Sequence, residues 1–149
     1  MDRERSSSQL APGQVGWDWF ALQLADGRDL MLYVLRRADG STDWRSATLI
    51  ERDGAVRLLA ADAWTVAARG TWQSPRGARY PSGWDVAVPG EGIRVRVEPL
   101  VAGAENRSSV GGGFGYWEGP VRLTGADGRP AGEGYVELTG YGEGTRPPI

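Results

Sequence analysis

The sequence predicts an all-β protein, a single antiparallel β-barrel of about eight to ten strands with an internal hydrophobic cavity. Short runs of alternating apolar and polar residues recur down the chain, as expected for strands with one buried and one solvated face. Asp-Gly pairs separate several of these runs, and Asp-Gly is a strong hairpin signal because glycine tolerates the positive φ of tight turns. No window shows sustained helical periodicity. A meander of hairpins favours a barrel, since closure removes exposed sheet edges.

The first half of the chain is predicted to form consecutive hairpins. A turn at residues 25–28 joins the first two runs, and Asp-Gly turns follow at residues 39–40 and 53–54. The expected strands are residues 17–24, 29–37, 48–51 and 56–59.

The second half continues the pattern with a break before its last strands. A Ser-Pro-Arg-Gly turn is expected at residues 74–77, and the expected strands are residues 64–72, 84–88 and 93–98. Residues 102–115 contain too much glycine for a strand. This segment is interpreted as a mobile loop that closes over a barrel mouth like a lid, or equally as a plain flexible linker.

The final third contains two predicted strands joined by a tight turn at residues 126–129. Their alternation separates a polar face from an apolar one. Glu118 and Glu137, framed by phenol rings, are unusual for an ordinary solvated sheet and indicate a ligand site. The polar face carries Tyr116, Glu118, Arg122, Tyr135, Glu137 and Tyr141, and the apolar face carries Trp117, Val121, Leu123, Val136 and Leu138.

Composition restricts the chemistry that this protein can perform. The 149 residues include no His, Cys or Lys, and all 17 basic residues are arginine. The usual neutral-pH base, a thiolate nucleophile, sulfur metal ligands and a Schiff-base lysine are therefore excluded. Catalysis would depend on carboxylates, phenols, indole N–H groups, hydroxyls or backbone amides. We expect neither a metal site nor a cofactor.

Length and charge indicate one soluble, cytoplasmic domain. A net charge of −2 argues against nucleic acid or an anionic membrane as the main partner. No apolar run approaches the roughly 20 residues of a membrane span, and the N-terminus lacks a secretory h-region. We expect a leader at residues 1–15, the barrel at 16–141 and a tail at 142–149.

Seven tryptophans and five tyrosines must be accommodated in this small chain. They either fill the barrel or line a pocket for a hydrophobic, partly oxygenated ligand, because each ring combines an apolar body with one polar group. The residues expected to bind substrate are Trp17, Trp19, Met31, Trp72, Trp84 and Trp117.

Several stretches carry a family resemblance, in order: Gly16-Trp17-Asp18-Trp19, 29–36, Trp72-Gln73-Ser74-Pro75, Tyr80-Pro81, Tyr116-Trp117-Glu118-Gly119 and 134–141. Over nearly its whole length the chain resembles the C-terminal lipocalin-like domain of the carotenoid 1,2-hydratase (hydroxyneurosporene synthase) and AttH-like superfamily. Members typically have two tandem lipocalin-like barrels. Since only one is present, we expect a homodimer in which a second copy covers the surface of the missing domain.

Hydratase-type members carry an Asp-His-Glu-Trp-like motif before the Gly-Trp-Asp-Trp strand. The corresponding stretch is Asp2-Arg3-Glu4-Arg5, with Arg3 at the position of the histidine associated with proton transfer. Arginine does not exchange a proton near pH 7, because its pKa is above 12. The hydratase route is therefore disfavoured.

The superfamily resemblance also includes lipocalin-like cyclases that run intramolecular Diels–Alder reactions. The leading hypothesis is thus a cofactor-independent cyclase acting on a linear polyene or polyketide. In it, Tyr33, Tyr116 or Tyr135 would donate to a carbonyl, while Glu118 and Glu137 would serve as acid or base, or belong to a structural network. The alternatives are an isoprenoid hydratase or isomerase, and a non-catalytic carrier of an apolar metabolite.

Overall fold

The computed structural model describes residues 10–107 and 114–142. This part of the chain is almost entirely β-structure, with one short 3-10 helix, η1 (Pro89–Glu91). The strands are β1 (Gln14–Leu24), β2 (Asp29–Arg37), β3 (Thr42–Ile50), β4 (Val56–Leu59), β5 (Thr65–Ala68), β6 (Thr71–Gln73), β7 (Arg79–Pro81), β8 (Trp84–Val88), β9 (Ile93–Pro99), β10 (Glu105–Arg107), β11 (Gly115–Gly125) and β12 (Pro130–Leu138).

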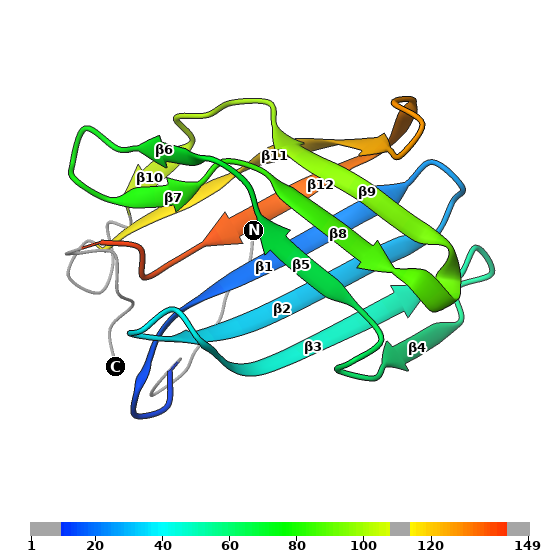
Figure 1. The fold of residues 1–149 in the computed structure, drawn as a ribbon, viewed down its shortest axis with the longest axis horizontal. Helices are drawn as coiled ribbons and strands as arrows, with labels where there is room; N and C mark the ends of the chain where they lie inside the picture. The colour runs from blue at the N-terminus through cyan, green and yellow to red at the C-terminus, as the bar shows by residue number, and fades with distance from the viewer. Residues whose placement is uncertain (1–9, 108–113, 143–149) are drawn as a thin grey trace.

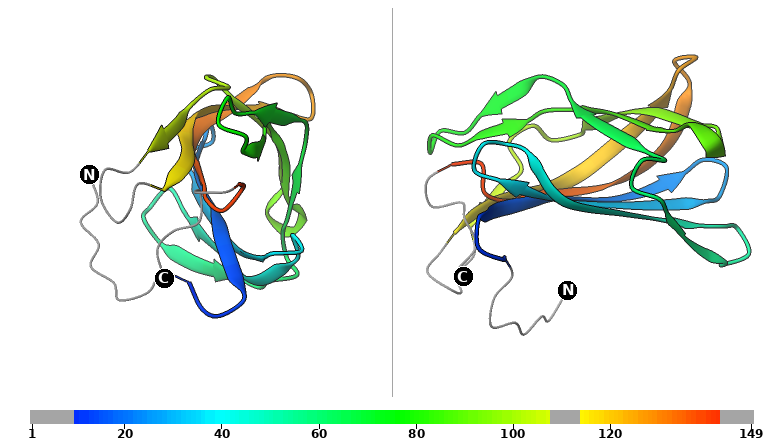
Figure 2. Two further views of the ribbon diagram at one scale, coloured as in Figure 1. Left: turned by 90° about the vertical axis from the view of Figure 1, so that its left-hand side faces the viewer. Right: turned by 60° about the horizontal axis from the view of Figure 1, so that its bottom comes forward.

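Ten of these strands form one antiparallel sheet (Figure 1). Its order is β4-β3-β2-β1-β12-β11-β9-β8-β5, with β10 paired to β11, and β6 and β7 form a separate hairpin. The sheet curls strongly on itself, so that an end view shows the strands arranged around an interior (Figure 2). The predicted all-β class and antiparallel arrangement are confirmed.

The first and last strands of the sequence lie side by side at the middle of the sheet. Phe20 on β1 is opposite Leu32 on β2 and Val136 on β12. Alternate residues of these strands point into the curl and are buried, as the period of two requires. The inward residues of the central strands are Phe20, Leu22, Leu24, Leu30, Leu32, Val34, Trp117, Val121, Leu123, Val136 and Leu138.

Aromatic rings connect opposite sides of the curled sheet. Trp84 on β8 packs edge-on against Phe20, with ring centroids 5.4 Å apart, and lies 6.4 Å from Trp117. Because β1 and β8 are well separated in the strand order, the Phe20–Trp84 contact crosses the interior. The two walls of the barrel thus share one hydrophobic core.

The Asp-Gly hairpin turns lie where the sequence predicts them. Gly27, Gly40, Gly54 and Gly128 all have φ between 77° and 87°. L-residues other than glycine rarely adopt this conformation, which explains why these four turns are readable from sequence.

Four segments differ from the expectations. The strand expected at residues 48–51 begins earlier, at Thr42, as β3. Residues 64–72 divide into β5 and β6, and β7 lies where no strand was expected. The glycine-rich segment 102–115 contains β10, which pairs Glu105 with Trp117. The expectation of a segment without strands is therefore wrong for Glu105–Arg107, because these three residues contain no glycine and pair with residues 115–117 of β11. Residues 108–113, most of the expected lid, and the Asp2–Arg5 stretch lie outside the described residues.

No helix within residues 10–107 and 114–142 is long and apolar enough to cross a membrane.

Replacing Gly16 should destabilise the pairing of β1 with the end of β12. A Cβ atom there would overlap the Thr139 carbonyl and lie 2.9 Å from Cα of Gly140. We expect Gly16→Ala to lower the free energy of unfolding by about 2–3 kcal/mol in urea titrations, since backbone atoms must move. Gly90→Ala is the control, because nothing lies within 4 Å of its Cβ position. Equal stabilities of the two variants would contradict this account.

Candidate active site at one end of the barrel

Asp18 places a carboxyl group on the inner side of β1. It is in phase with the buried Phe20 and only 14% of its side chain is exposed. The Tyr141 hydroxyl donates to this carboxyl group, with its oxygen 2.8 Å from Oδ2, and Arg36 Nε donates to Oδ1 at 2.9 Å. Asp18 is therefore fixed by two donors from separate parts of the chain.

Arg36 holds this end of the barrel together. Its side chain is 11% exposed and its guanidinium carbon lies 3.9 Å from the centre of the Tyr141 ring. The same guanidinium donates to the carbonyl of Thr139, whose hydroxyl accepts a bond from the Trp17 backbone N–H at 2.9 Å. These contacts fix the end of β12 against β1 and β2.

The protonation of this cluster departs from ordinary values. Burial raises the pKa of Asp18, although Arg36 and the Tyr141 hydrogen bond act in the opposite direction. Burial and the neighbouring Asp18 carboxylate raise the pKa of Tyr141. Tyr141 therefore remains a hydrogen-bond donor at neutral pH, and Asp18 holds a proton more readily than an exposed aspartate.

A second pair of a phenol and a carboxylate lies nearby. The Tyr80 hydroxyl donates to Oε1 of Glu105 at 3.2 Å, and Ser74 donates to Oε2 at 2.6 Å. The Glu105 side chain is 7% exposed, with an Arg76 nitrogen 3.6 Å away. Burial and then the charge of Glu105 raise the pKa of Tyr80. This phenol is also a donor at neutral pH.

Aromatic rings join the two pairs into one site. The rings of Tyr80 and Tyr141 are 5.6 Å apart, and Trp72 stacks on Tyr80 at 6.0 Å. The site thus combines two acids, two protonated phenols and a row of aromatic surfaces. Such a combination can donate protons and stabilise positive charge beside an apolar molecule.

Three of the predicted binding residues point toward the interior. Trp84 and Trp117 are fully buried in the core, and Trp72 is half-buried against it. Of these, Trp72 belongs to the aromatic row described above, whereas the indole of Trp117 donates to the Ala102 carbonyl at 2.8 Å.

The other predicted site residues lie together on the outer face of the sheet. Trp19 is opposite Tyr33 on one side and Glu137 on the other, and Glu137 is opposite Glu118. Their neighbours along each strand are the buried inward residues, so the alternation places this set outside the barrel. The set comprises Trp17, Trp19, Met31, Tyr33, Tyr116, Glu118, Tyr135 and Glu137. Their roles in binding and catalysis stay predictions.

Polar contacts connect this outer face. Trp17 Nε1 donates to Glu137 at 3.0 Å. Burial, followed by the charges of Glu118 and Glu137, raises the pKa of Tyr116. Glu137 therefore bonds to an indole, and both glutamates act on the Tyr116 phenol through their charge.

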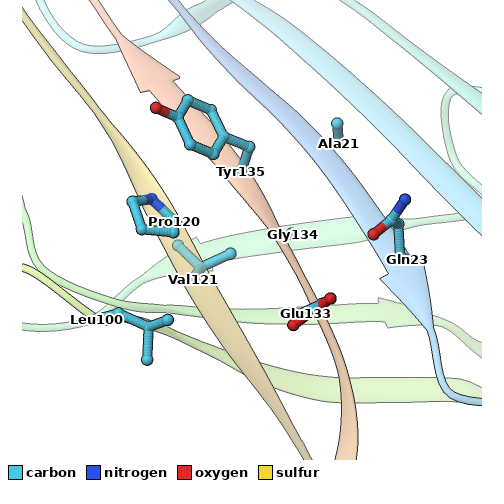
Figure 3. A pocket seen from close by; sticks show the side chains of 8 residues that line it. All are labelled: Ala21, Gln23, Leu100, Pro120, Val121, Glu133, Gly134 and Tyr135. Carbon is cyan, nitrogen blue, oxygen red and sulfur yellow. The ribbon is translucent and has the colours of Figure 1, made fainter.

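A groove of about 420 Å³ adjoins the outer face (Figure 3). It is open to solvent and includes Tyr135, the one predicted site residue in its lining. The lining residues are Ala21, Gln23, Leu100, Pro120, Val121, Glu133, Gly134 and Tyr135.

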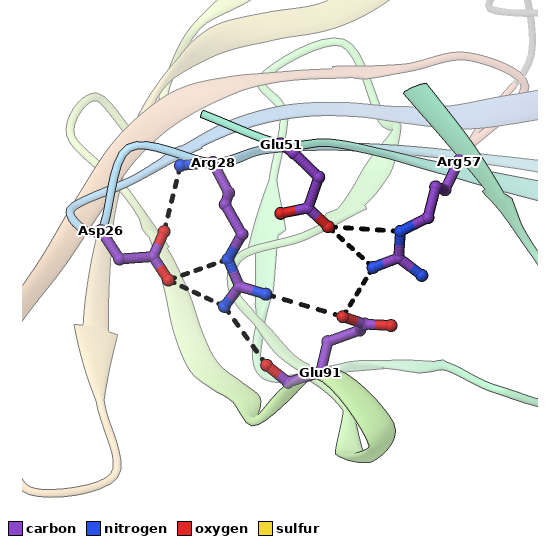
Figure 4. A network of polar contacts seen from close by, with 5 residues as sticks. All are labelled: Asp26, Arg28, Glu51, Arg57 and Glu91. Atoms are coloured by element: carbon purple, nitrogen blue, oxygen red, sulfur yellow. Dashed lines mark hydrogen bonds and ion pairs between the residues drawn. The ribbon is translucent and has the colours of Figure 1, made fainter. Parts of the chain in front are cut away.

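An ion-pair network (Figure 4) lies at the end of the barrel where β2 begins and β8 ends, opposite the end of β12 (Figure 1). Arg57 on β4 contacts Glu51 and Glu91, each at 2.8 Å, and Arg28 contacts Asp26 at 2.7 Å and Glu91 at 3.7 Å. Since Glu91 belongs to η1 between β8 and β9, this network links the edge strand β4 to the β8–β9 connection. Its geometry indicates a structural role.

Sequence reasoning did not assign Asp18, Arg36, Tyr80 or Glu105 to a site. It placed Tyr141 on the polar face with Glu118 and Glu137, whereas Tyr141 bonds to the inward Asp18. The sequence did contain one signal for Asp18. In a strand, Asp18 lies on the same face as Phe20, Leu22 and Leu24, because these residues occupy alternate positions. A carboxylate on an otherwise apolar face is a candidate functional group. Nothing comparable indicated Glu105, since its burial depends on Ser74 and Tyr80.

Comparisons with known proteins identify relatives of the chain. The family model described as AttH-like matches residues 1–141. A crystal structure described as an AttH protein from Nitrosomonas europaea is 39% identical, with a TM-score of 0.78 over 91% of this chain and 42% of that one. Kievitone hydratase from Nectria haematococca is 18% identical, with a TM-score of 0.64 over 84% of this chain and 39% of that one, and shares the fold alone. No curated protein matches. The lipocalin-like barrel fold is thereby confirmed, and the chain spans about two fifths of each solved relative.

The raised pKa of Asp18 predicts the direction in which the free energy of unfolding changes with pH. Between its ordinary value of 3.8 and its higher value in the folded protein, Asp18 is protonated when folded and ionised when unfolded. The folded state then binds more protons, so the stability that Asp18 contributes falls as pH rises through this window. Asp18→Asn does not titrate. Urea unfolding from about pH 3.5 to 7 should therefore show the stability difference, wild type minus variant, decreasing with pH. A difference that widens with pH would show the opposite shift.

Proposed function

The chain belongs to the AttH-like family, and we propose that it acts on an apolar, unsaturated small molecule by proton donation from Asp18, adding water across a carbon–carbon double bond. The observation that supports this most strongly is the enclosed carboxyl group of Asp18, with its raised pKa, beside an aromatic row. The missing histidine of the hydratase motif argued against hydration, and Asp18 supplies an acid in its place.

The proposed reaction has two steps. Protonated Asp18 transfers its proton to one alkene carbon, which leaves a carbocation at the other carbon and a carboxylate on Asp18. Water then attacks the cation and returns one proton to that carboxylate. The atoms of one water molecule are added, and the enzyme is regenerated.

The neighbours of Asp18 suit both steps. Arg36 and Tyr141 donate to its carboxyl oxygens and would stabilise the carboxylate formed by proton transfer. The ring faces of Trp72, Tyr80 and Tyr141 carry negative quadrupoles, which would stabilise a nearby carbocation by cation–π attraction. A proton donor alone would lack this second contribution.

The same site also supports a cyclase of the Diels–Alder type. Tyr80 and Tyr141 stay protonated, so either could polarise a substrate carbonyl, and the aromatic surfaces could restrict a flexible polyene. In this second candidate function Asp18 positions Tyr141 and does not exchange a proton with substrate.

Asp18→Asn should separate the two functions. We would incubate purified protein with extracts of the source strain deleted for this gene and follow consumed species by mass spectrometry. Wild type should yield a product heavier by one water, and Asp18→Asn should be slower by about 100-fold or more. Glu118→Gln is the control, because it makes the same carboxylate-to-amide change on the outer face and should keep the rate of wild type.

Each alternative has its own outcome. A product of unchanged mass, with Asp18→Asn active, supports the cyclase. A ligand retained unchanged supports a carrier. If only Glu118→Gln loses activity, the active site lies on the outer face and not at Asp18.

Tyr141→Phe should change the pH dependence of hydration. The variant removes a donor to the Asp18 carboxylate, which raises the pKa of Asp18 further. Because hydration requires the protonated acid, the decline of the rate toward high pH should begin at a higher pH than in wild type. An unshifted profile with a reduced rate would instead assign Tyr141 a direct role on substrate.

A further inference from the structure

A second groove, of about 460 Å³, lies along the wall of the barrel that β5, β8, β9 and β11 form. None of the residues placed around Asp18 lines it. Its charged lining residues are Arg69, Asp85, Arg94 and Arg96. Three arginines and one aspartate give this arginine groove a net charge of +2, whereas the whole chain carries −2. The positive charge is therefore local to the groove.

The pairing of the strands brings these side chains to one face. Asp85 on β8 is opposite Arg96 on β9, and Arg94 on β9 is opposite Ala87 on β8. Their neighbours along each strand are buried in the core, so the alternation of a strand places all four on the outer face. The arginine groove thus opens to solvent on the outside of the barrel.

Asp85 gathers two of the three guanidinium groups. Its Oδ2 accepts a hydrogen bond from Arg69 at 2.8 Å, and its Oδ1 lies 3.9 Å from Nε of Arg96. All three side chains are about half exposed, and ion pairs between such side chains are weak in water. Both arginines can therefore bind an incoming anion while they remain close to Asp85.

Arg94 contributes a positive charge that no carboxylate offsets. Its guanidinium makes no ion pair and no hydrogen bond within residues 10–107 and 114–142. It stands two residues before Arg96 on the same face of β9, a separation of roughly 7 Å along a strand. An anion placed between the two would reach both.

Small residues form the floor of the groove. Ala87 lies on the outer face, yet it is only 9% exposed, as expected for a residue at the bottom of a concave surface. Gly125 and Gly128 add backbone without side chains, and Thr65 and Thr124 add hydroxyl donors. The groove combines a cationic rim with a small, partly apolar floor.

We propose that the arginine groove binds a small organic phosphate. Arg69, Arg94 and Arg96 hold its phosphate group, and its carbon body covers the floor at Ala87. A phosphate monoester carries a charge close to −2 at neutral pH, which matches the charge of the groove. The planar guanidinium also matches pairs of phosphate oxygens with two parallel hydrogen bonds. This site lies outside the barrel and does not depend on the reaction at Asp18.

The test is a titration of the ¹⁵N-labelled protein with phenyl phosphate, followed by backbone amide shifts in NMR spectra. The amides of residues 85–87, 94–96 and 124–126 should shift together and saturate. Phenyl sulfate has the same ring and a single negative charge, and it should bind at least about threefold more weakly. Equal affinity for the two ligands, or no shifts at these amides, would overturn the proposal.

Arg94→Gln should weaken the binding of phenyl phosphate by about three- to tenfold, the range expected for one exposed charge-assisted hydrogen bond. Arg79→Gln is the matched control, because Arg79 on β7 is also exposed and lies outside the groove. It removes the same charge from the chain and should change the affinity less than twofold. Equal losses in the two variants would show attraction to the overall charge alone and would refute the site.

Two further ligands distinguish the sources of the phosphate group. Inorganic phosphate should shift the same amides with at least about threefold lower affinity, because it has no carbon body to cover the floor. Equal affinity for inorganic phosphate and phenyl phosphate would overturn the assignment to an ester. Vesicles of phosphatidylcholine with phosphatidic acid should not sediment the protein. Sedimentation that Arg94→Gln abolishes would refute a small-molecule site in favour of a lipid headgroup.

Discussion

The pairing of β1 with β12 is the constraint on which the rest of the structure depends. It joins segments about 120 residues apart in sequence, as in the bond between Trp17 and Thr139. The two strands approach closely because Gly16 and Gly140 face each other without side chains. Only with this pairing in place can Tyr141, which follows β12, reach Asp18 on β1. Pairing of such distant segments also implies slow, cooperative folding. The entropic cost of closing a long loop arises before the stabilising contacts between the two strands can form.

The interior site follows from that pairing together with the curl of the sheet. Because the sheet curls, its inner face has less room than its outer face. On β1 the inner face carries Phe20 and Leu22, and the larger indoles of Trp17 and Trp19 lie on the outer face. Polar groups that enter the interior must find partners, and Asp18 and Glu105 each do so through a phenol. The result is a site in which the strands of the barrel hold acids against aromatic rings.

Much of the fold was readable from the sequence because its signals are local. The Asp-Gly turns and the alternation at residues 93–98 depend on a few neighbouring residues and agree with the structure. Alternation separates two faces but does not say which one is inside. On β1 both faces are rich in large apolar residues, so Trp17 and Trp19 were as good candidates for the interior as Phe20. Glu105 depended on contacts with Ser74 and Tyr80, which no local pattern encodes.

The ion pairs of Arg57 have a consequence for solubility. β4 is an edge strand of the sheet, and its Val56 and Leu58 side chains are 66% and 75% exposed. An exposed apolar edge is a template on which another chain can add a strand and begin to aggregate. Arg57 stands between these two residues, and its contacts with Glu51 and Glu91 keep a charge at this edge. Charged residues within such a segment act as gatekeepers against intermolecular β-sheet formation. The same arginine that links β4 to the β8–β9 connection within one molecule thus discourages that sheet from growing into the next.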